Sequence, residues 1–158
     1  MIAAAHLAVG AAVGLMVQDC LSGQSNNHRK LVTASVAGFA SHILLDAFPH
    51  QEYTIDGFWL GAVLFLEIIS VFMLILSFQN SWLVNSIIFF GMVGGALPDV
   101  TDLVYKYLFQ WQWLGNLGGR IHYFHGAIPI SFEVNLFVQL LLALLVVASI
   151  IFARLKSA

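Results

Sequence analysis

The sequence predicts an all-α integral membrane protein, a single domain of five transmembrane helices with one short interfacial helix. Three observations lead to this prediction. Hydrophobic residues make up 60% of the 158 residues and charged residues only 9%, whereas a soluble domain has about 25% charged residues. The mean hydropathy is +0.90, and a soluble fold of this size has too little interior to hide so much apolar surface. Five apolar stretches of roughly membrane-spanning length are separated by short polar segments.

The predicted spans lie at residues 1–17, 31–48, 57–78, 82–97 and 130–153. The first span carries Gly10 and Gly14 one helical turn apart, so another helix can approach it closely. This span lacks the basic start of a signal peptide and contains a histidine. We therefore expect it to be retained as a helix rather than cleaved.

The region after the fourth span differs from the rest of the chain. Pro98 is expected to end that span, because proline removes a backbone donor and clashes with the preceding turn. Residues 102–112 then predict a short helix whose many aromatic side chains suit the headgroup interface. Residues 114–119 contain three glycines and are expected to form a mobile segment.

The basic residues predict the orientation. A five-span chain places the loop at 18–30 and the C-terminus on the same side, and these segments hold four of the six Lys and Arg residues. That side is cytoplasmic by the positive-inside rule. The N-terminus, the acidic loop at 49–56 and the region at 98–127 then face outward.

The strongest chemical signal is the segment HILLDAFPH at residues 42–50. Its aspartate and two histidines are spaced four residues apart, so they share one face on a continuous helix. The helix is expected to end near Phe48, because Pro49 disfavours helical geometry at the residue before it, and His50 would lie on the turn beyond. Imidazole and carboxylate together can bind a divalent metal. The alternative is a set of polar residues that form hydrogen bonds near the interface.

Other candidates occur further along and at the start of the chain. Asp99 and Asp102 share a helical face, and their alternative role is to cap a helix N-terminus. His122 and His125 have the same spacing, but in a loop they could simply be solvated. His6 could be a satisfied polar residue near a chain end.

All these groups fall on the predicted outer side, although the basic residues alone selected that side. Unrelated polar residues have no reason to gather at one level, and a charge at the centre of a span costs roughly 2.5–3.5 kcal/mol. We therefore expect a metal site there, holding one or two zinc ions, with manganese or iron as alternatives. Asp46 and Asp99 are the candidate catalytic residues, because a carboxylate not committed to the metal could accept the proton of an attacking water. The candidate metal ligands are His6, His42, Asp46, His50, Asp99, Asp102, His122 and His125.

Three residues outside this set also bear on function. Glu67 lies inside the third span, where it is either buried and hydrogen-bonded or directed toward the site. Arg120 could bind a phosphate-bearing substrate or extend to the interface. Cys20 is the only cysteine, which excludes an internal disulfide and a cysteine-based zinc site. No basic run indicates binding to nucleic acid.

The motifs occur in a recognisable order: an early histidine at His6, the pattern His-x-x-x-Asp-x-x-Pro-His at 42–50, Leu-Pro-Asp at 97–99, and a later His-Gly at 125–126. They resemble the small bacterial membrane-bound metal-dependent hydrolases. These are multi-span inner-membrane proteins, some of them described as similar to zinc-dependent phospholipase C.

The resemblance covers most of the chain and implies a specific set of metal ligands. The chain departs from the family in one respect. Many relatives read Leu-Pro-Asp-x-Asp-His, whereas Leu103 follows the second aspartate here. This leaves the number of metal ions open, and His122 could substitute. The ligands implied by the resemblance are His6, His42, Asp46, Asp99, Asp102 and His125.

We therefore expect a metal-dependent hydrolase that acts on a membrane lipid or lipid-linked phosphoester at the outer face. A metal-ion transporter component is an alternative, and it predicts ionisable residues strung through the membrane depth. A second alternative is a non-catalytic structural membrane protein whose polar residues bridge helices. The sequence does not indicate an oligomeric state.

Overall fold

A computed structural model describes residues 3–46, 57–76, 81–121 and 131–155 of the chain. Five long helices account for most of them: α1 (Ala3–Cys20), α2 (Asn27–Asp46), α3 (Gly57–Leu76), α4 (Trp82–Val104) and α6 (Phe132–Leu155). The π-helical turn η1 (Tyr105–Phe109) continues α4, and the short helix α5 (Gln112–Ile121) follows it. These ranges contain no strand, which confirms the prediction of an all-α fold.

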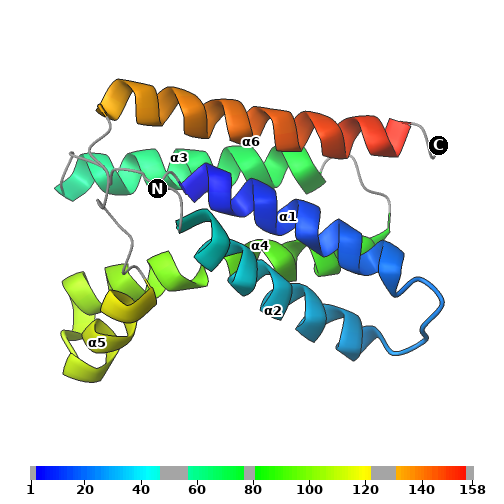
Figure 1. Cartoon of the computed structure of the whole chain (residues 1–158), viewed down its shortest axis with the longest axis horizontal. Helices are drawn as coiled ribbons and strands as arrows, with labels where there is room; N and C mark the ends of the chain where they lie inside the picture. Colours follow the sequence, from blue (N-terminus) through cyan, green and yellow to red (C-terminus); the bar gives the residue numbers. More distant parts are fainter. Residues whose placement is uncertain (1–2, 47–56, 77–80, 122–130, 156–158) are drawn as a thin grey trace.

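The long helices run back and forth along the longest axis of the molecule (Figure 1). Helices α1, α2 and α4 pack together on one side, and α3 and α6 lie on the other side against α1. The connection from α1 to α2 and the C-terminus lie at one end, and η1 and α5 lie at the opposite end (Figure 1). The end that carries α5 extends beyond the start of α1 and the end of α2.

Glycines on α1, α2 and α4 bring three backbones into direct contact. A Cβ atom at Gly10 of α1 would lie 2.5 Å from the carbonyl oxygen of Gly91 on α4, and one at Gly14 would lie 2.8 Å from the carbonyl oxygen of Ile87. A Cβ atom at Gly38 of α2 would collide with the same Gly91 oxygen. The close approach predicted for Gly10 and Gly14 is confirmed, and α4 is the helix that approaches.

The prediction that Pro98 ends the fourth span is wrong. Helix α4 continues through Pro98 to Val104 and leads directly into η1. A proline within a helix leaves the carbonyl four residues before it, here that of Gly94, without its usual donor, and buried helices can tolerate this loss. The adjacent carbonyl of Gly95 accepts a hydrogen bond from the imidazole Nδ1 of His42, on α2, at 2.8 Å.

The segment expected to be mobile at 114–119 is helical instead, since it lies within α5. A Cβ atom at Gly115 would lie 2.5 Å from the ring of Tyr105, so α5 packs closely against η1 at this point. The tight reversal between η1 and α5 is made at Gln110, whose φ of 47° is left-handed. The short interfacial helix predicted at 102–112 is therefore replaced by the end of α4, η1 and the start of α5.

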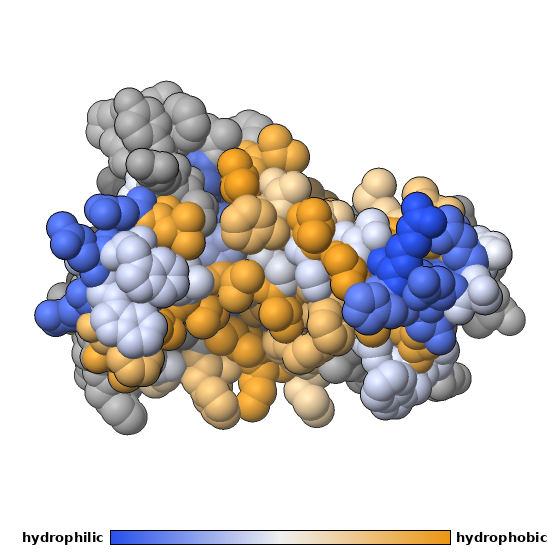
Figure 2. Space-filling model, turned by 90° about the horizontal axis from the view of Figure 1, so that it is seen from below, coloured by the Kyte–Doolittle hydropathy of each residue, from blue (hydrophilic) through white to orange (hydrophobic). Residues whose placement is uncertain are grey.

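Among the described residues, one helix is long and apolar enough to cross a membrane, namely α4. The apolar helical stretches Ala4–Cys20 and Phe137–Phe152 are shorter. Figure 2 shows apolar residues across the middle of one face, with hydrophilic residues gathered at both ends. The prediction of five spans stays a prediction.

Candidate metal centre

Four polar side chains from three helices meet where α1, α2 and α4 pack together. His6 comes from α1, His42 and Asp46 come from α2, and Asp99 comes from α4. The side chains of both histidines are fully buried, and that of Asp46 is 2% exposed. Asp99 is 28% exposed, so the site opens on the side of this carboxylate.

Local structure explains how each side chain reaches this point. His6 is the fourth residue of α1, and His42 and Asp46 lie one turn apart at the end of α2. Asp99 follows Pro98 within α4. Gly95 brings α4 against α1 at this level, because a Cβ atom there would lie 2.8 Å from the carbonyl oxygen of His6.

The nitrogen and oxygen atoms of the four side chains face one another at short range. Nε2 of His42 lies 3.0 Å from Oδ2 of Asp46 and 3.8 Å from Oδ1 of Asp99. Nε2 of His6 lies 3.4 Å from Oδ1 of Asp46 and 3.9 Å from Oδ2 of Asp99. The two imidazole rings stack with their centroids 4.0 Å apart. Each carboxylate therefore lies near both imidazoles.

The hydrogen bond to Gly95 defines the tautomer of His42. A carbonyl oxygen can only accept, so the Nδ1 atom of His42 donates its proton to Gly95 across 2.8 Å. In a neutral imidazole this leaves a lone pair on Nε2, which is the nitrogen that faces both carboxylates. This arrangement is the one found in metal-binding histidines, where the second nitrogen is held by a carbonyl or carboxylate.

Lone pairs on nitrogen and carboxylate oxygen repel one another unless a proton or a cation lies between them. Each protonated imidazole could bridge one pair of these atoms, whereas a divalent cation can bind several of the groups at once. Zinc bonds of about 2.0–2.2 Å in tetrahedral geometry place neighbouring ligand atoms roughly 3.3–3.6 Å apart. The four nitrogen–oxygen distances, between 3.0 and 3.9 Å, lie on both sides of this range. The residues present therefore fit a divalent metal.

The group formed by His6, His42 and Asp99 could hold such an ion, because its ligand atoms all lie within 4.8 Å of one another. Asp46 is not part of this group, but its carboxylate lies 3.0 Å from Nε2 of His42 and 3.4 Å from Nε2 of His6. The geometry does not distinguish zinc from manganese or iron.

The electrostatics of α2 and α4 also favour a cation at this position. Asp46 is the last residue of α2, whose final turn contains no basic residue. A carboxylate at the negative end of a helix is unfavourable unless a positive charge lies nearby. Neither α1 nor α4 contains Lys or Arg, and those of α2 lie in its first turn, at the other end of the helix.

The structure describes only some of the predicted ligands. His50, His122 and His125 lie outside the described residues, as does the side chain of Arg120. Asp102 is half-buried one turn after Asp99 and is not part of the three-residue group.

The capping role considered for the two aspartates of α4 is excluded, because both Asp99 and Asp102 lie far from its N-terminus. No local pattern in the sequence identifies Gly95, whose carbonyl orients His42. The only signal for this residue is the small-residue pair at 94–95, just before the Leu-Pro-Asp motif.

Comparisons of the chain with protein-family models, with curated proteins and with solved structures give no match.

Proposed function

We propose that this protein is a multi-pass inner-membrane hydrolase that uses a divalent metal, zinc in the first instance, to cleave a lipid or lipid-linked phosphoester at the outer face. One observation carries the proposal. His6, His42 and Asp99, from three helices, bring two imidazoles and a carboxylate close enough together to bind one cation, and the buried Asp46 lies beside both imidazoles. The order of the motifs, which resembles that of the bacterial membrane-bound metal-dependent hydrolases, supports the same class.

The distribution of apolar side chains supports the membrane location. Helix α4 has the length and composition of a span. Large apolar side chains on α3 and α6 are exposed, including Phe65 and Leu66 at 61% each, and Phe137 at 66%. Exposed apolar surface of this extent is stable in lipid and unfavourable in water. Hydrophilic residues at both ends of the apolar face are consistent with two headgroup regions (Figure 2).

A divalent cation at this centre would polarise a phosphoryl oxygen and activate a water molecule as the nucleophile. The protein side chains would divide the remaining work according to their exposure. His6, His42 and Asp46 are buried and suited to hold the ion in place. Asp99 is the carboxylate that solvent and substrate can reach, so it is placed to accept a proton from the attacking water.

The decisive experiment combines metal content with hydrolysis. Purified wild-type protein should retain a divalent metal and hydrolyse a phospholipid or an undecaprenyl-type phosphoester in mixed micelles. Asp99→Asn keeps the size of the side chain but loses its charge, and it should abolish turnover while the helical circular dichroism is unchanged. Glu133→Gln is the matched control, because Glu133 is an exposed acidic residue in the first turn of α6. Equal hydrolysis by wild type and Asp99→Asn would exclude a catalytic role for Asp99.

One observation favours a second candidate, a component of a metal-ion transporter. The backbone N–H of Ala4, two residues from His6, donates to the carboxylate of Glu67, the eleventh residue of α3. The centre is therefore level with the middle of α3, about 15 Å of helix from its start. Transporters place their ion sites at such depths. Uptake of zinc by proteoliposomes, without hydrolysis of any lipid, would favour the transporter.

The orientation can be tested with the native cysteine. Cys20 is exposed at the end of α1, and the positive-inside rule places this end in the cytoplasm. A membrane-impermeant maleimide should therefore label Cys20 only after the membrane is opened, whereas Gln51→Cys in a Cys20→Ser background should label in intact cells. The reverse pattern would place the centre on the cytoplasmic side and exclude an outer-leaflet substrate.

A further inference from the structure

Within the described ranges, a polar contact joins helix α3 to the helix that carries His6. The carboxylate Oε2 of Glu67 accepts a hydrogen bond from the backbone N–H of Ala4 at 3.4 Å. Ala4 lies two residues before His6, in the same first turn of α1. The contact therefore holds the segment of backbone from which His6 extends.

The first turn of α1 has no hydroxyl, amide or carboxylate side chain of its own that could accept a hydrogen bond from its free N–H groups. The first N–H groups of any α-helix lack an acceptor within the helix, and Ser, Thr, Asp or Asn side chains usually supply one. Helix α1 starts with three alanines and has no acidic residue in its first turn. The acceptor comes instead from a side chain 63 residues away in the sequence.

The surroundings of Glu67 show that this contact is specific. Glu67 is the only ionisable residue in α3, which is otherwise almost entirely apolar. Its neighbours Leu66 and Ile68 are 61% and 38% exposed, whereas Glu67 is half-buried against the start of α1. An ionisable side chain within an apolar span is costly unless it has a role.

The two histidines of the centre are held in different ways. The Nδ1 atom of His42 is fixed by the carbonyl of Gly95. The Nδ1 atom of His6 is buried and has no hydrogen-bond partner within the described part of the chain. The position of the His6 ring therefore depends on its stacking against His42, on the contacts of its Nε2 atom with the two carboxylates, and on the backbone of the first turn of α1.

We infer that Glu67 is a positioning residue for the metal centre, which acts through Ala4 to hold His6 in reach of the ion. The inference rests on the proposed metal site. Without the contact, the first turn of α1 frays and the His6 imidazole leaves its place beside Asp46 and Asp99. The role requires a hydrogen-bond acceptor and not a negative charge, so glutamine should replace glutamate and leucine should not.

The test measures metal affinity by competition with a chelator, on full-length protein in detergent. Loss of an outer hydrogen-bond partner weakens metal binding by about 10- to 100-fold, and this is the effect expected for Glu67→Leu. Glu67→Gln should stay within about 3-fold of wild type, because its amide oxygen still accepts the bond. Equal affinities for Glu67→Leu and wild type would overturn the inference.

A double-mutant cycle with His6→Ala separates positioning from a general effect on folding. If Glu67 acts through His6, then Glu67→Leu has no further effect on affinity once the imidazole is gone. A full additional loss in the double variant would overturn the inference.

The absorption spectrum of bound cobalt gives a second readout that does not depend on affinity. At saturating cobalt, Glu67→Leu should shift the visible bands toward those of His6→Ala, and Glu67→Gln should not. A wild-type spectrum for Glu67→Leu would overturn the positioning role. If wild-type protein binds no metal at all, the proposed hydrolase fails, whereas a metal-binding wild type with an unaffected Glu67→Leu variant contradicts the positioning role alone.

Discussion

The two regions of this bundle differ in how their helices meet. Helices α1, α2 and α4 share most of the contacts between helices, and their backbones touch at glycines. Helices α3 and α6 contact α1 through side chains and expose much of their large apolar surface. We refer to the first region as the inner unit and to the second as the outer pair.

This difference explains why the candidate metal site lies in the inner unit. A metal site needs its ligands held to within a fraction of an ångström, and backbones in contact cannot shift without separating. Among the described residues, the four polar groups at the candidate centre come from the inner unit. The outer pair contributes the contact from Glu67 to α1.

The largest expected effect is the loss of the metal from the inner unit. His42→Ala and Asp46→Ala each remove a buried ligand group, and each should reduce bound metal from stoichiometric to near zero without preventing membrane insertion. Elemental analysis of purified protein measures this directly. Glu133→Ala in the outer pair is the control and should retain all the metal. Wild-type protein that carries no metal, even after reconstitution at neutral pH, would leave the helix-bridging role as the explanation of these residues.

The next largest effect is on the free energy of unfolding, and it can be compared by a glycine-to-alanine substitution in each region. Gly91→Ala places a Cβ atom against the backbone of α1 at Gly10 and Gly14. Overpacking usually lowers the free energy of unfolding by about 1–3 kcal/mol. We expect a loss of at least about 3 kcal/mol here, because backbone atoms cannot move aside. Gly61→Ala in α3 meets nothing within 4 Å and should stabilise the helix by about 0.5–1 kcal/mol. Thermal unfolding in detergent compares the two, and equal effects would contradict the distinction between the regions.

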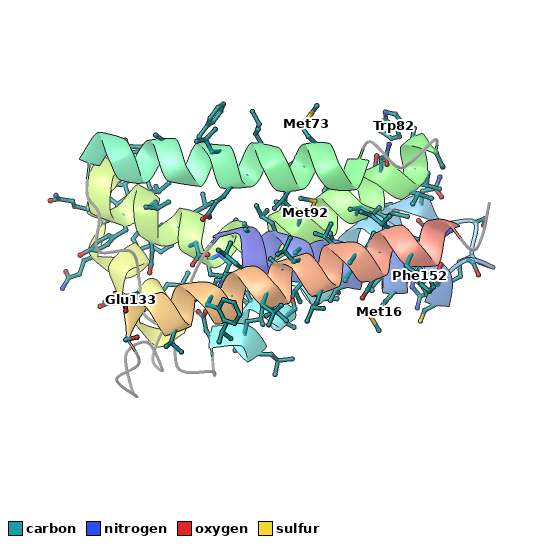
Figure 3. All side chains as sticks on the ribbon, turned by 90° about the horizontal axis from the view of Figure 1, so that it is seen from above. Met16, Met73, Trp82, Met92, Glu133 and Phe152 are labelled. Carbon is teal, nitrogen blue, oxygen red and sulfur yellow. The ribbon has the colours of Figure 1, made fainter. Side chains whose placement is uncertain are left out.

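The smallest difference in unfolding free energy between the two regions is expected from a pair of methionines. Met92, on α4 of the inner unit, is fully buried in an apolar cluster with residues of α1, α3 and α6, whereas Met73 is 69% exposed and points away from the bundle (Figure 3). Met92→Ala should cost about 2–3 kcal/mol, because it leaves a cavity. Met73→Ala should change the free energy of unfolding by less than about 0.5 kcal/mol. A large cost at Met73 would show that this face is covered by another protein surface rather than by lipid.

Much of the fold follows from local properties of the sequence. The apolar stretches predict the five long helices to within a few residues at most ends, because helix formation depends on nearby residues and on hydrophobicity. The spacing of His42 and Asp46 likewise predicts their contact, since residues four apart on a helix are neighbours. The structure places Nε2 of the first 3.0 Å from Oδ2 of the second.

Two features could not be read from local pattern. Pro98 predicts the end of a helix, but α4 continues through it and packs closely against α1 at Gly95. The three glycines at 114–119 predict mobility, but Gly115 lets α5 pack on Tyr105. In both cases a contact between distant residues overrides the local preference.

The pattern of residue types is sufficient to name the side chains that are chemically able to bind a metal and to place the long helices. It does not show that His6 and Asp99 meet His42 and Asp46 at one point, or that Glu67 accepts a hydrogen bond from the first turn of the helix of His6. The physical reason is that helical periodicity extends only a few residues along the chain. The register between helices is decided instead by backbone contacts such as that of Gly95 with His6, which join residues far apart in the sequence.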